Sequence, residues 1–338
     1  MTDSLVADIE NCLENGWSDG LPVIPPYSGL VDDMLAAMGY AATDIIGEIA
    51  DQQIQVRAEH AAATAVMAGC KTAYGPLLRE LALAALDPRF NLSGTEVTTG
   101  GASVTVFVSG PVVAALGFEH EANALGANNR ANATVGRYAQ MLRHFCGRGG
   151  GVLKCHGTVG HPGRISFCVA EHPSTVWAPF HTQFGLPAAS SAVTLMATEG
   201  PNSCNNHYAA TGAAVLETIA DCMAHYGQTN WYYRSGGFVV VLPPDHMDLI
   251  HREFNRDQAR AYIHEKARRS TDELIRVGRI AQPPLPYAEV EPGQPRSPLK
   301  NLEQLQFIEC GAAGGRFSAV IPRWVGSLHA ICRAVPNL

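Results

Sequence analysis

Short, strongly apolar segments alternate with amphipathic segments along most of this chain, and this alternation constrains the fold more than any other feature. Strands are expected where β-branched residues cluster between glycines, and helices where apolar residues recur every three or four positions. The predicted strands cover residues 102–109, 165–171, 192–197, 237–243 and 305–310. The predicted helices cover residues 3–15, 57–70, 76–86, 132–145, 209–226, 246–254 and 258–268. This rate of alternation indicates an α/β or α+β protein with a mixed sheet.

The length of 338 residues allows a single large globular domain, or two closely packed α/β units at about residues 1–150 and 151–338. A weak internal repeat supports two units. A helix with a late cysteine comes before a valine-rich, glycine-flanked strand both ahead of Pro111 and ahead of Pro243. We therefore expect one large domain, with two similar α/β units as the finer alternative.

Composition excludes several classes of partner. Hydrophobic residues make up 46% and charged residues 16% of the chain, which is typical of a folded protein with a large core. The net charge of −7 contains no long run of one sign, so neither nucleic acid nor a membrane is an expected partner. No segment has the roughly 20 apolar residues of a membrane span, and no secretory signal is recognised. Nine cysteines without CxxC spacing favour a cytoplasmic protein, which we expect to be a homo-oligomer.

The asparagine-rich segment 121–137 is the strongest candidate for one wall of a small-molecule site. Asn132 is predicted to cap the helix that follows, which would leave free backbone N–H groups and the positive end of the helix dipole at the segment. Arg130 and Arg137 add cationic side chains, and this combination suits an anion. We expect Arg130, Asn132 and Arg137 to hold the substrate, with Asn129 beside them. The alternative is a capped helix after a polar loop.

The loop at residues 15–26 carries Asp19 between glycines and prolines that restrict its backbone. Such a loop is either a structural clasp over the domain or a binding segment. Asp19 is therefore included among the candidate substrate-binding residues.

Two cysteines are candidate nucleophiles. Cys155 lies in a glycine-rich segment with Arg148, Lys154 and Arg164 nearby in the sequence, and a basic setting lowers the pKa of a thiol. Cys70 ends a predicted helix, where the helix dipole disfavours a thiolate. The alternative for both is a small core residue, because free cysteines are most often buried.

Glu59 and His181 are the candidates for general acid–base catalysis. Glu59 is predicted on the apolar face of helix 57–70, where loss of water would raise its carboxyl pKa towards that of a general base. His181 follows the turn at Trp177 and is the next candidate. The alternatives are a solvent-exposed charge in the first turn of a helix and a packed turn histidine.

No cofactor is predicted, and a divalent metal ion is the alternative. His60, His120, His156 and His181 supply ligand types, but none has the HExxH or CxxC spacing of a zinc site. A metal site in this chain would therefore have to be assembled from separate segments.

Six segments, in order along most of the chain, are distinctive: DGLPVIPP (19–26), AVMAGC (65–70), RANATVGR (130–137), GHPG (160–163) with Cys168 and Glu171, WAPFH (177–181) and GGRFS (314–318). Together they resemble a poorly characterised bacterial family whose members are often fused to, or encoded beside, a small domain with a UGSC (selenocysteine-Gly-Ser-Cys) motif. The resemblance implies a bacterial enzyme with thiol or redox chemistry. Because this chain contains no Cys-Gly-Ser-Cys segment, redox chemistry is expected to need a partner protein.

The chain as a whole predicts an enzyme that acts on a small, polar, anionic molecule by lyase or hydrolase chemistry, with general acid–base or cysteine catalysis. The first alternative is a thiol- or metal-dependent oxidoreductase that works with a redox partner protein. The second alternative is a non-enzymatic protein that binds a small molecule.

Overall fold

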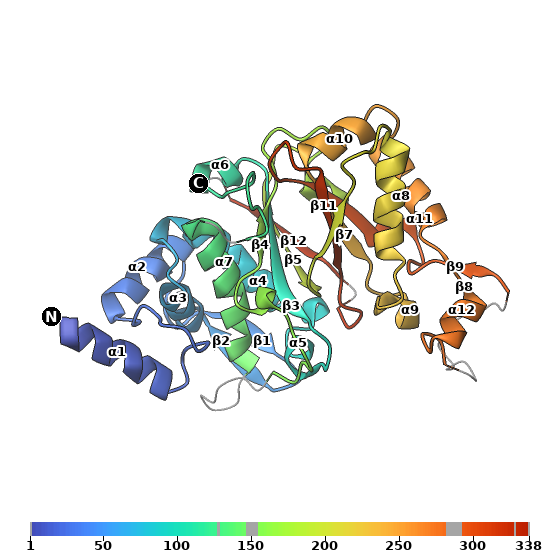
Figure 1. Cartoon of the computed structure of the whole chain (residues 1–338). Helices are drawn as coiled ribbons and strands as arrows, with labels where there is room; N and C mark the ends of the chain where they lie inside the picture. The colour runs from blue at the N-terminus through green and yellow to red at the C-terminus, as the bar shows by residue number, and fades with distance from the viewer. Residues whose placement is uncertain (1, 127–128, 147–154, 282–292, 328, 337–338) are drawn as a thin grey trace.

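The computed structural model describes residues 2–126, 129–146, 155–281, 293–327 and 329–336. The centre of the protein consists of two four-stranded mixed sheets that pack face to face, with helices on both outer faces (Figure 1). The predicted α/β or α+β class with a mixed sheet is therefore confirmed.

The first sheet contains strands β3 (Ser103–Ser109), β4 (Cys168–Ala170), β5 (Ser191–Thr198) and β12 (Ile331–Val335). Its strand order is β12–β5–β3–β4, in which β3 and β4 are parallel and the other neighbours are antiparallel. Its outer face is covered by helices α4 (Gly75–Ala85) and α7 (Arg130–Met141), and helices α2 (Ser28–Met38) and α3 (Ala58–Met67) pack against these two. The apolar residues of these helices and of the sheet form one continuous core.

The second sheet contains strands β6 (Asn202–Asn205), β7 (Phe238–Leu242), β10 (Leu305–Glu309) and β11 (Phe317–Pro322). Its strand order is β10–β7–β11–β6, in which β10 and β7 are parallel and the other neighbours are antiparallel. Its outer face is covered by helices α8 (Gly212–Met223), α10 (Pro244–Ile250) and α11 (Arg256–Lys266).

Alternate residues of the central strands face different layers. On β3, Val104, Val106 and Val108 pack against the helices, whereas Phe107 faces the second sheet. Because both faces of each sheet are covered, every residue of β3 and of β7 is buried. This burial explains why both strands are continuous apolar runs in the sequence.

Each sheet has one parallel pair followed by two antiparallel neighbours, and we refer to each sheet with its covering helices as a unit. Strands β4 and β5 come after residue 150, near which a boundary between units was predicted, and they belong to the first sheet. The second unit runs from β6 to β11, and the chain then returns to add β12 to the first sheet. Hydrogen bonds between distant segments decide the boundary, and local composition does not reveal them.

The remaining elements surround this core. Helix α1 (Thr2–Glu14) comes first, and β1 (Ile45–Ile49) forms a hairpin with β2 (Ile54–Arg57). The short elements are α5 (Gly94–Val97), α6 (Val112–Leu116), α9 (Asn230–Tyr233), α12 (Thr271–Arg276), β8 (Arg269–Ser270) and β9 (Pro295–Arg296). None of the helices in the described part of the chain combines the length and the apolar character of a membrane span.

Candidate functional site

The parallel strand pairs of both sheets end at the same side of the molecule. His172, two residues after β4, donates its backbone N–H to the carbonyl of Glu309, the last residue of β10, at 2.7 Å. Gly311 donates its N–H to the carbonyl of His120, in the loop after α6, at 2.8 Å. Ligand sites of α/β sheets form at the carboxyl ends of parallel strands. The fold therefore favours a ligand site at this side.

Three ionisable side chains converge there: those of His120, Glu121 and His172. One ligand-type atom from each residue lies within 4.8 Å of the other two. The rings of His120 and His172 meet edge to face with their centroids 4.8 Å apart, and His172 Nε2 lies 3.9 Å from Glu121 Oε1. The tertiary structure thus places the loop after α6, which carries His120 and Glu121, beside the carboxyl end of β4.

His120 has a ring nitrogen without a partner. Its Nδ1 is shielded from water and makes no hydrogen bond to any residue that the structure describes. Burial, followed by the charge of His172, lowers the pKa of His120, so this ring is neutral near pH 7. An unpaired polar atom removed from water costs about 1–3 kcal/mol, which a bound ligand or ion would offset.

His172 is held in one tautomer. The backbone N–H of Ser174 donates to His172 Nδ1 at 3.0 Å, so the proton of the neutral ring is on Nε2. His172 Nε2, which carries this proton, lies 3.9 Å from Glu121 Oε1. The side chains of His172 and Glu121 are 29% and 62% exposed, so this donor is accessible to a molecule from solution.

Two buried carboxyl groups lie next to His172. Glu171 accepts the N–H of Phe180 at 2.8 Å, and the two oxygens of Glu309 accept the N–H groups of Val176 and Trp177, each at 2.8 Å. Burial raises the pKa of Glu171 to about 8, and the charge of Glu309 adds to this effect. Burial also raises the pKa of Glu309. Glu171 is therefore mostly protonated at neutral pH.

Two cavities open beside these residues. One, of about 330 Å³, is lined by Glu121 and Gly311, and the other, of about 290 Å³, is lined by His172 and Glu309. Cys310 lines both, but burial raises the pKa of its thiol to about 12, so it carries no thiolate at neutral pH. We call these two cavities, together with the side chain of His120 that clusters with Glu121 and His172, the strand-end crevice; its residues are His120, Glu121, His172, Glu309 and Cys310.

The side chains of the predicted anion-binding wall make hydrogen bonds to other parts of the protein, and Arg130 is also exposed. Asn129, not Asn132, is the N-cap of α7, and its side chain accepts the N–H of Asn132 at 3.0 Å. The capping prediction was wrong because the helix begins earlier and Asn132 points inward. The Asn132 amide accepts the N–H of Glu119 at 2.8 Å and donates to the Glu119 carbonyl at 3.0 Å. Arg130 donates through Nε to the carbonyl of Gly69 at 3.0 Å.

The loop at residues 15–26 is a structural clasp in this structure. Asp19 accepts two hydrogen bonds from Arg137, and the side chains of the pair are only 18% and 15% exposed. Burial opposes ionisation of Asp19, but the hydrogen bonds and charge of Arg137 outweigh it and lower the carboxyl pKa. Asp19 and Arg137, which were both predicted to bind substrate, are therefore paired with each other.

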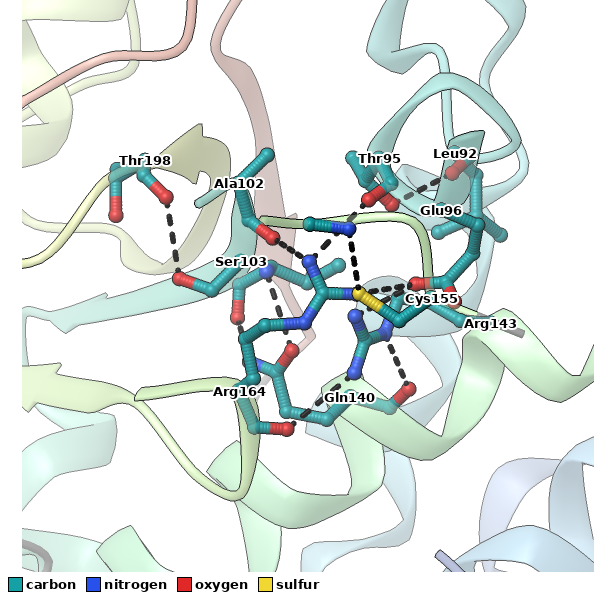
Figure 2. A network of polar contacts seen from close by, with 12 residues as sticks. Leu92, Thr95, Glu96, Ala102, Ser103, Gln140, Arg143, Cys155, Arg164 and Thr198 are labelled. Atoms are coloured by element: carbon teal, nitrogen blue, oxygen red, sulfur yellow. Dashed lines mark hydrogen bonds and ion pairs between the residues drawn. The ribbon is translucent and has the colours of Figure 1, made fainter. Parts of the chain in front are cut away.

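Cys155 lies beside a buried ion-pair network at the amino end of β3 (Figure 2). Glu96 Oε1 accepts hydrogen bonds from Arg143 at 2.6 Å and from Arg164 at 2.9 Å. Figure 2 shows the sulfur of Cys155 next to the guanidinium group of Arg143. Cys155 is exposed, and its Sγ accepts the N–H of Gly157 at 3.3 Å.

The structure thus adds Arg143 to the basic surroundings that the sequence suggested for Cys155. Arg164 is present there, whereas Arg148 and Lys154 lie outside the described residues. Cys70 is different: it is buried, its Sγ lies 3.4 Å from the carbonyl of Thr134, and burial raises its pKa to about 12. Of the two predicted nucleophiles, only Cys155 is open to solvent.

The two predicted acid–base residues occupy contrasting places. Glu59 is exposed in the first turn of α3, one residue after the buried Ala58, so its predicted position on the apolar face was wrong. Consecutive helical residues are rotated by about 100°, which turns Glu59 away from the core. His181 is fully buried; its Nδ1 lies 2.8 Å from Ser109 Oγ and its Nε2 3.0 Å from the carbonyl of Pro187. Burial lowers the pKa of this packed histidine.

Only part of the cluster of His120, Glu121 and His172 was predicted from the sequence. Within the described residues, His120 is the one member of the proposed metal-ligand pool that joins the cluster; His60, His156 and His181 do not. His172 and Glu309 were not selected from the sequence. Both stand at the ends of predicted strands, at 165–171 and 305–310, so the rule for the carboxyl ends of parallel strands would have found them.

Comparison of the chain with family models, with curated proteins and with solved structures finds no match. The resemblance to the UGSC-associated family therefore stays a prediction, and function has to be inferred from the geometry of the site.

Proposed function

We propose that this protein is an enzyme that acts on a small polar molecule in the strand-end crevice, by lyase or hydrolase chemistry with general acid–base catalysis. The observation that carries the proposal is the contact between His120 and His172. The ring of His120 is neutral and has a nitrogen without a partner among the described residues, while Ser174 holds the proton of the His172 ring on Nε2. A proton acceptor beside an oriented hydrogen-bond donor is an arrangement that acid–base chemistry requires.

The two histidines suit different roles. His120 would accept a proton from the substrate or from an attacking water, because burial keeps its ring in the neutral form. The Nε2–H of His172 would donate a hydrogen bond to the substrate oxygen on which negative charge develops. Glu121 would stabilise the positive charge that His120 acquires, since its carboxylate belongs to the same cluster.

An anionic substrate is not required by this proposal. The expectation of an anion came from Arg137 and Asn132, and these side chains are bonded to Asp19 and to the backbone of Glu119. The crevice itself presents the carboxyl groups of Glu121 and Glu309, which favour neutral or cationic polar groups.

A divalent metal ion held by His120, Glu121 and His172 is the second candidate, favoured by the unpartnered nitrogen of His120 and by ligand atoms within 4.8 Å of one another. Bond lengths of about 2.0–2.2 Å to zinc place tetrahedral ligands about 3.4 Å apart, so the three side chains would move closer together. Binding through His172 Nε2 would also require the ring proton to move to Nδ1, which breaks the bond from Ser174. A bound metal would activate water or polarise the substrate.

Cobalt titration separates the two candidates, because Co²⁺ bound to histidine and carboxylate ligands absorbs visible light. Under the metal reading, the wild type binds one equivalent, His120→Gln and His172→Gln bind none, and the exposed His60→Gln serves as an unchanged control. Under the metal-free reading, no saturable signal develops, and activity survives chelation.

Activity is tested by incubating the purified protein with a polar metabolite extract and following the loss of individual masses. Loss of a compound with the wild type and with His60→Gln, but not with His120→Gln or His172→Gln, is the expected result. General base catalysis contributes about 10²–10⁴-fold, so the decrease in rate should be of that size. No consumption by the wild type, together with retention of one compound by the protein, would instead identify a binding protein.

A further inference from the structure

A large cavity, here called the hairpin cavity, lies where the β1–β2 hairpin, the end of α4 and α5 come together (Figure 1). Its volume is about 710 Å³, more than twice that of either cavity of the strand-end crevice. Trp324 and Gly326, which follow β11, also line it. None of the described residues that line the hairpin cavity is basic, whereas three are acidic: Glu48, Asp51 and Asp87.

Much of this negative charge has no counter-charge. Asp87 is paired with Arg89, whose Nη2 lies 2.6 Å from Asp87 Oδ2. Asp51 accepts a hydrogen bond from Ser93 Oγ at 3.0 Å but pairs with no basic residue in the described part of the chain, and the exposed side chain of Glu48 bonds to no residue described there. Helix α4 ends at the wall of the cavity without a basic residue in its last turn, so the negative end of its dipole adds to the effect. The hairpin cavity therefore attracts cations.

Two polar groups of the lining are also open to a ligand. Gln52 Oε1 is shielded from water and accepts no hydrogen bond from any residue that the structure describes. Such an oxygen is unfavourable, and an N–H donor of a ligand would satisfy it. Trp324 is only 8% exposed, and its indole N–H donates to none of the described residues. The face of an indole ring attracts cations, and Leu86 and Leu92 add apolar surface to the same cavity.

We propose that the hairpin cavity binds a small organic cation, a molecule with a primary ammonium group and an apolar body. An ammonium group carries N–H donors for the carboxylates of Glu48 and Asp51 and for the amide oxygen of Gln52, whereas a quaternary ammonium group has none. The volume falls within the roughly 300–1,000 Å³ of sites for small molecules. This site is separate from the strand-end crevice and does not depend on the function proposed for it.

Calorimetric titration with tryptamine at pH 7 tests the proposal, at an ionic strength held constant with sodium chloride. Tryptophol, which has a hydroxyl group in place of the ammonium group and the same apolar body, is titrated in parallel. The wild type should bind one equivalent of tryptamine. Tryptophol should bind at least about tenfold more weakly, because it cannot form the charge-assisted hydrogen bonds.

Asp51→Asn should weaken the binding of tryptamine about tenfold, because it removes one of the unpaired charges. Asp33→Asn is the matched control: Asp33 is an exposed aspartate on α2 that does not line the cavity, and its loss should leave binding unchanged. Glu48→Gln provides a second cavity variant if Asp51→Asn lowers the melting temperature.

Four results would overturn the proposal. The first is that neither tryptamine nor the smaller phenethylamine shows saturable binding to the wild type. The second is that tryptophol binds as tightly as tryptamine, since the apolar body alone would then explain binding. The third is that Asp51→Asn and Asp33→Asn weaken binding equally, which indicates general charge attraction. The fourth is that Asp51→Asn and Glu48→Gln both bind tryptamine like the wild type, which places the ligand elsewhere on the protein.

Discussion

Arg137 and Asp19, 118 positions apart in the sequence, form a two-point ion pair that ties the N-terminal loop to α7. Arg137 Nε donates to Asp19 Oδ2 at 2.9 Å, and Nη2 donates to Oδ1 at 2.7 Å. The same guanidinium donates to the carbonyl of Leu21 at 3.3 Å. A lysine has no such fork of coplanar donors. The pair is therefore a structural link between two segments, built from residues whose local sequence suggested substrate binding.

Arg137→Lys should lower the free energy of unfolding by about 1–3 kcal/mol, because a charge-assisted two-point contact is lost in a partly buried place. Asp19→Asn should cost a similar amount, and the two losses should not add in the double variant. Thermal unfolding of the three variants and the wild type measures this coupling. An unchanged melting temperature together with a large loss of substrate turnover would restore the role of Arg137 in substrate binding.

Glu96→Gln should be among the most destabilising single substitutions in the chain, at about 3–5 kcal/mol, because it leaves two buried guanidinium groups without a counter-charge. Side-chain exposure is 7% for Glu96, 9% for Arg143 and 13% for Arg164. Asp248→Asn is the matched control, since its pair with Arg252 is about 60% exposed on both sides and contributes at most about 1 kcal/mol. Similar denaturation midpoints for the two variants would show that the network contributes little.

Thiol reagents should modify Cys155 much faster than the buried cysteines. Cys155 is exposed beside Arg143, whereas burial raises the pKa values of Cys70 and Cys310 to about 12. Brief treatment with iodoacetamide at pH 7, followed by peptide mass mapping, gives the order of modification, with Cys155→Ser as the control. Modification of Cys70 at the rate of Cys155 would show that the end of α3 opens in solution.

Glu171→Gln should make stability less dependent on pH. The carboxyl pKa rises from its usual value of 4.5 to about 8 in the folded protein, mainly through burial. Between these values the folded protein keeps a proton that the unfolded chain releases, so the free energy of unfolding falls as pH rises through this window, by at most about 1.4 kcal/mol per pH unit. The melting temperature of the variant, measured relative to that of the wild type, should therefore be higher at pH 8.5 than at pH 5. A constant difference across this range would mean that Glu171 ionises at its usual pKa.

Much of the fold could be predicted from local patterns. Val135, Tyr138 and Leu142 form a stripe at helical spacing and are all fully buried, and the apolar runs at 237–243 and 305–310 become β7 and β10. These predictions succeed because helix and strand periodicity depends on neighbours within a few residues. Helix ends were less reliable, as Asn129 and Asn132 show, because both residues are good caps and only packing around Glu119 selects between them.

The amino-acid sequence by itself therefore determined the fold class, several of the central elements and the core-facing stripe of α7, whereas it did not reveal α2, β6, β11 or β12. Tertiary structure alone decided which polar side chains meet: His120 reaches His172 because β4 pairs with β3 while the loop after α6 hydrogen-bonds to the end of β10. It also decided that Arg137 faces Asp19. The physical reason is that such contacts depend on strand pairing and sheet packing between distant segments, whose free energies are properties of the whole chain.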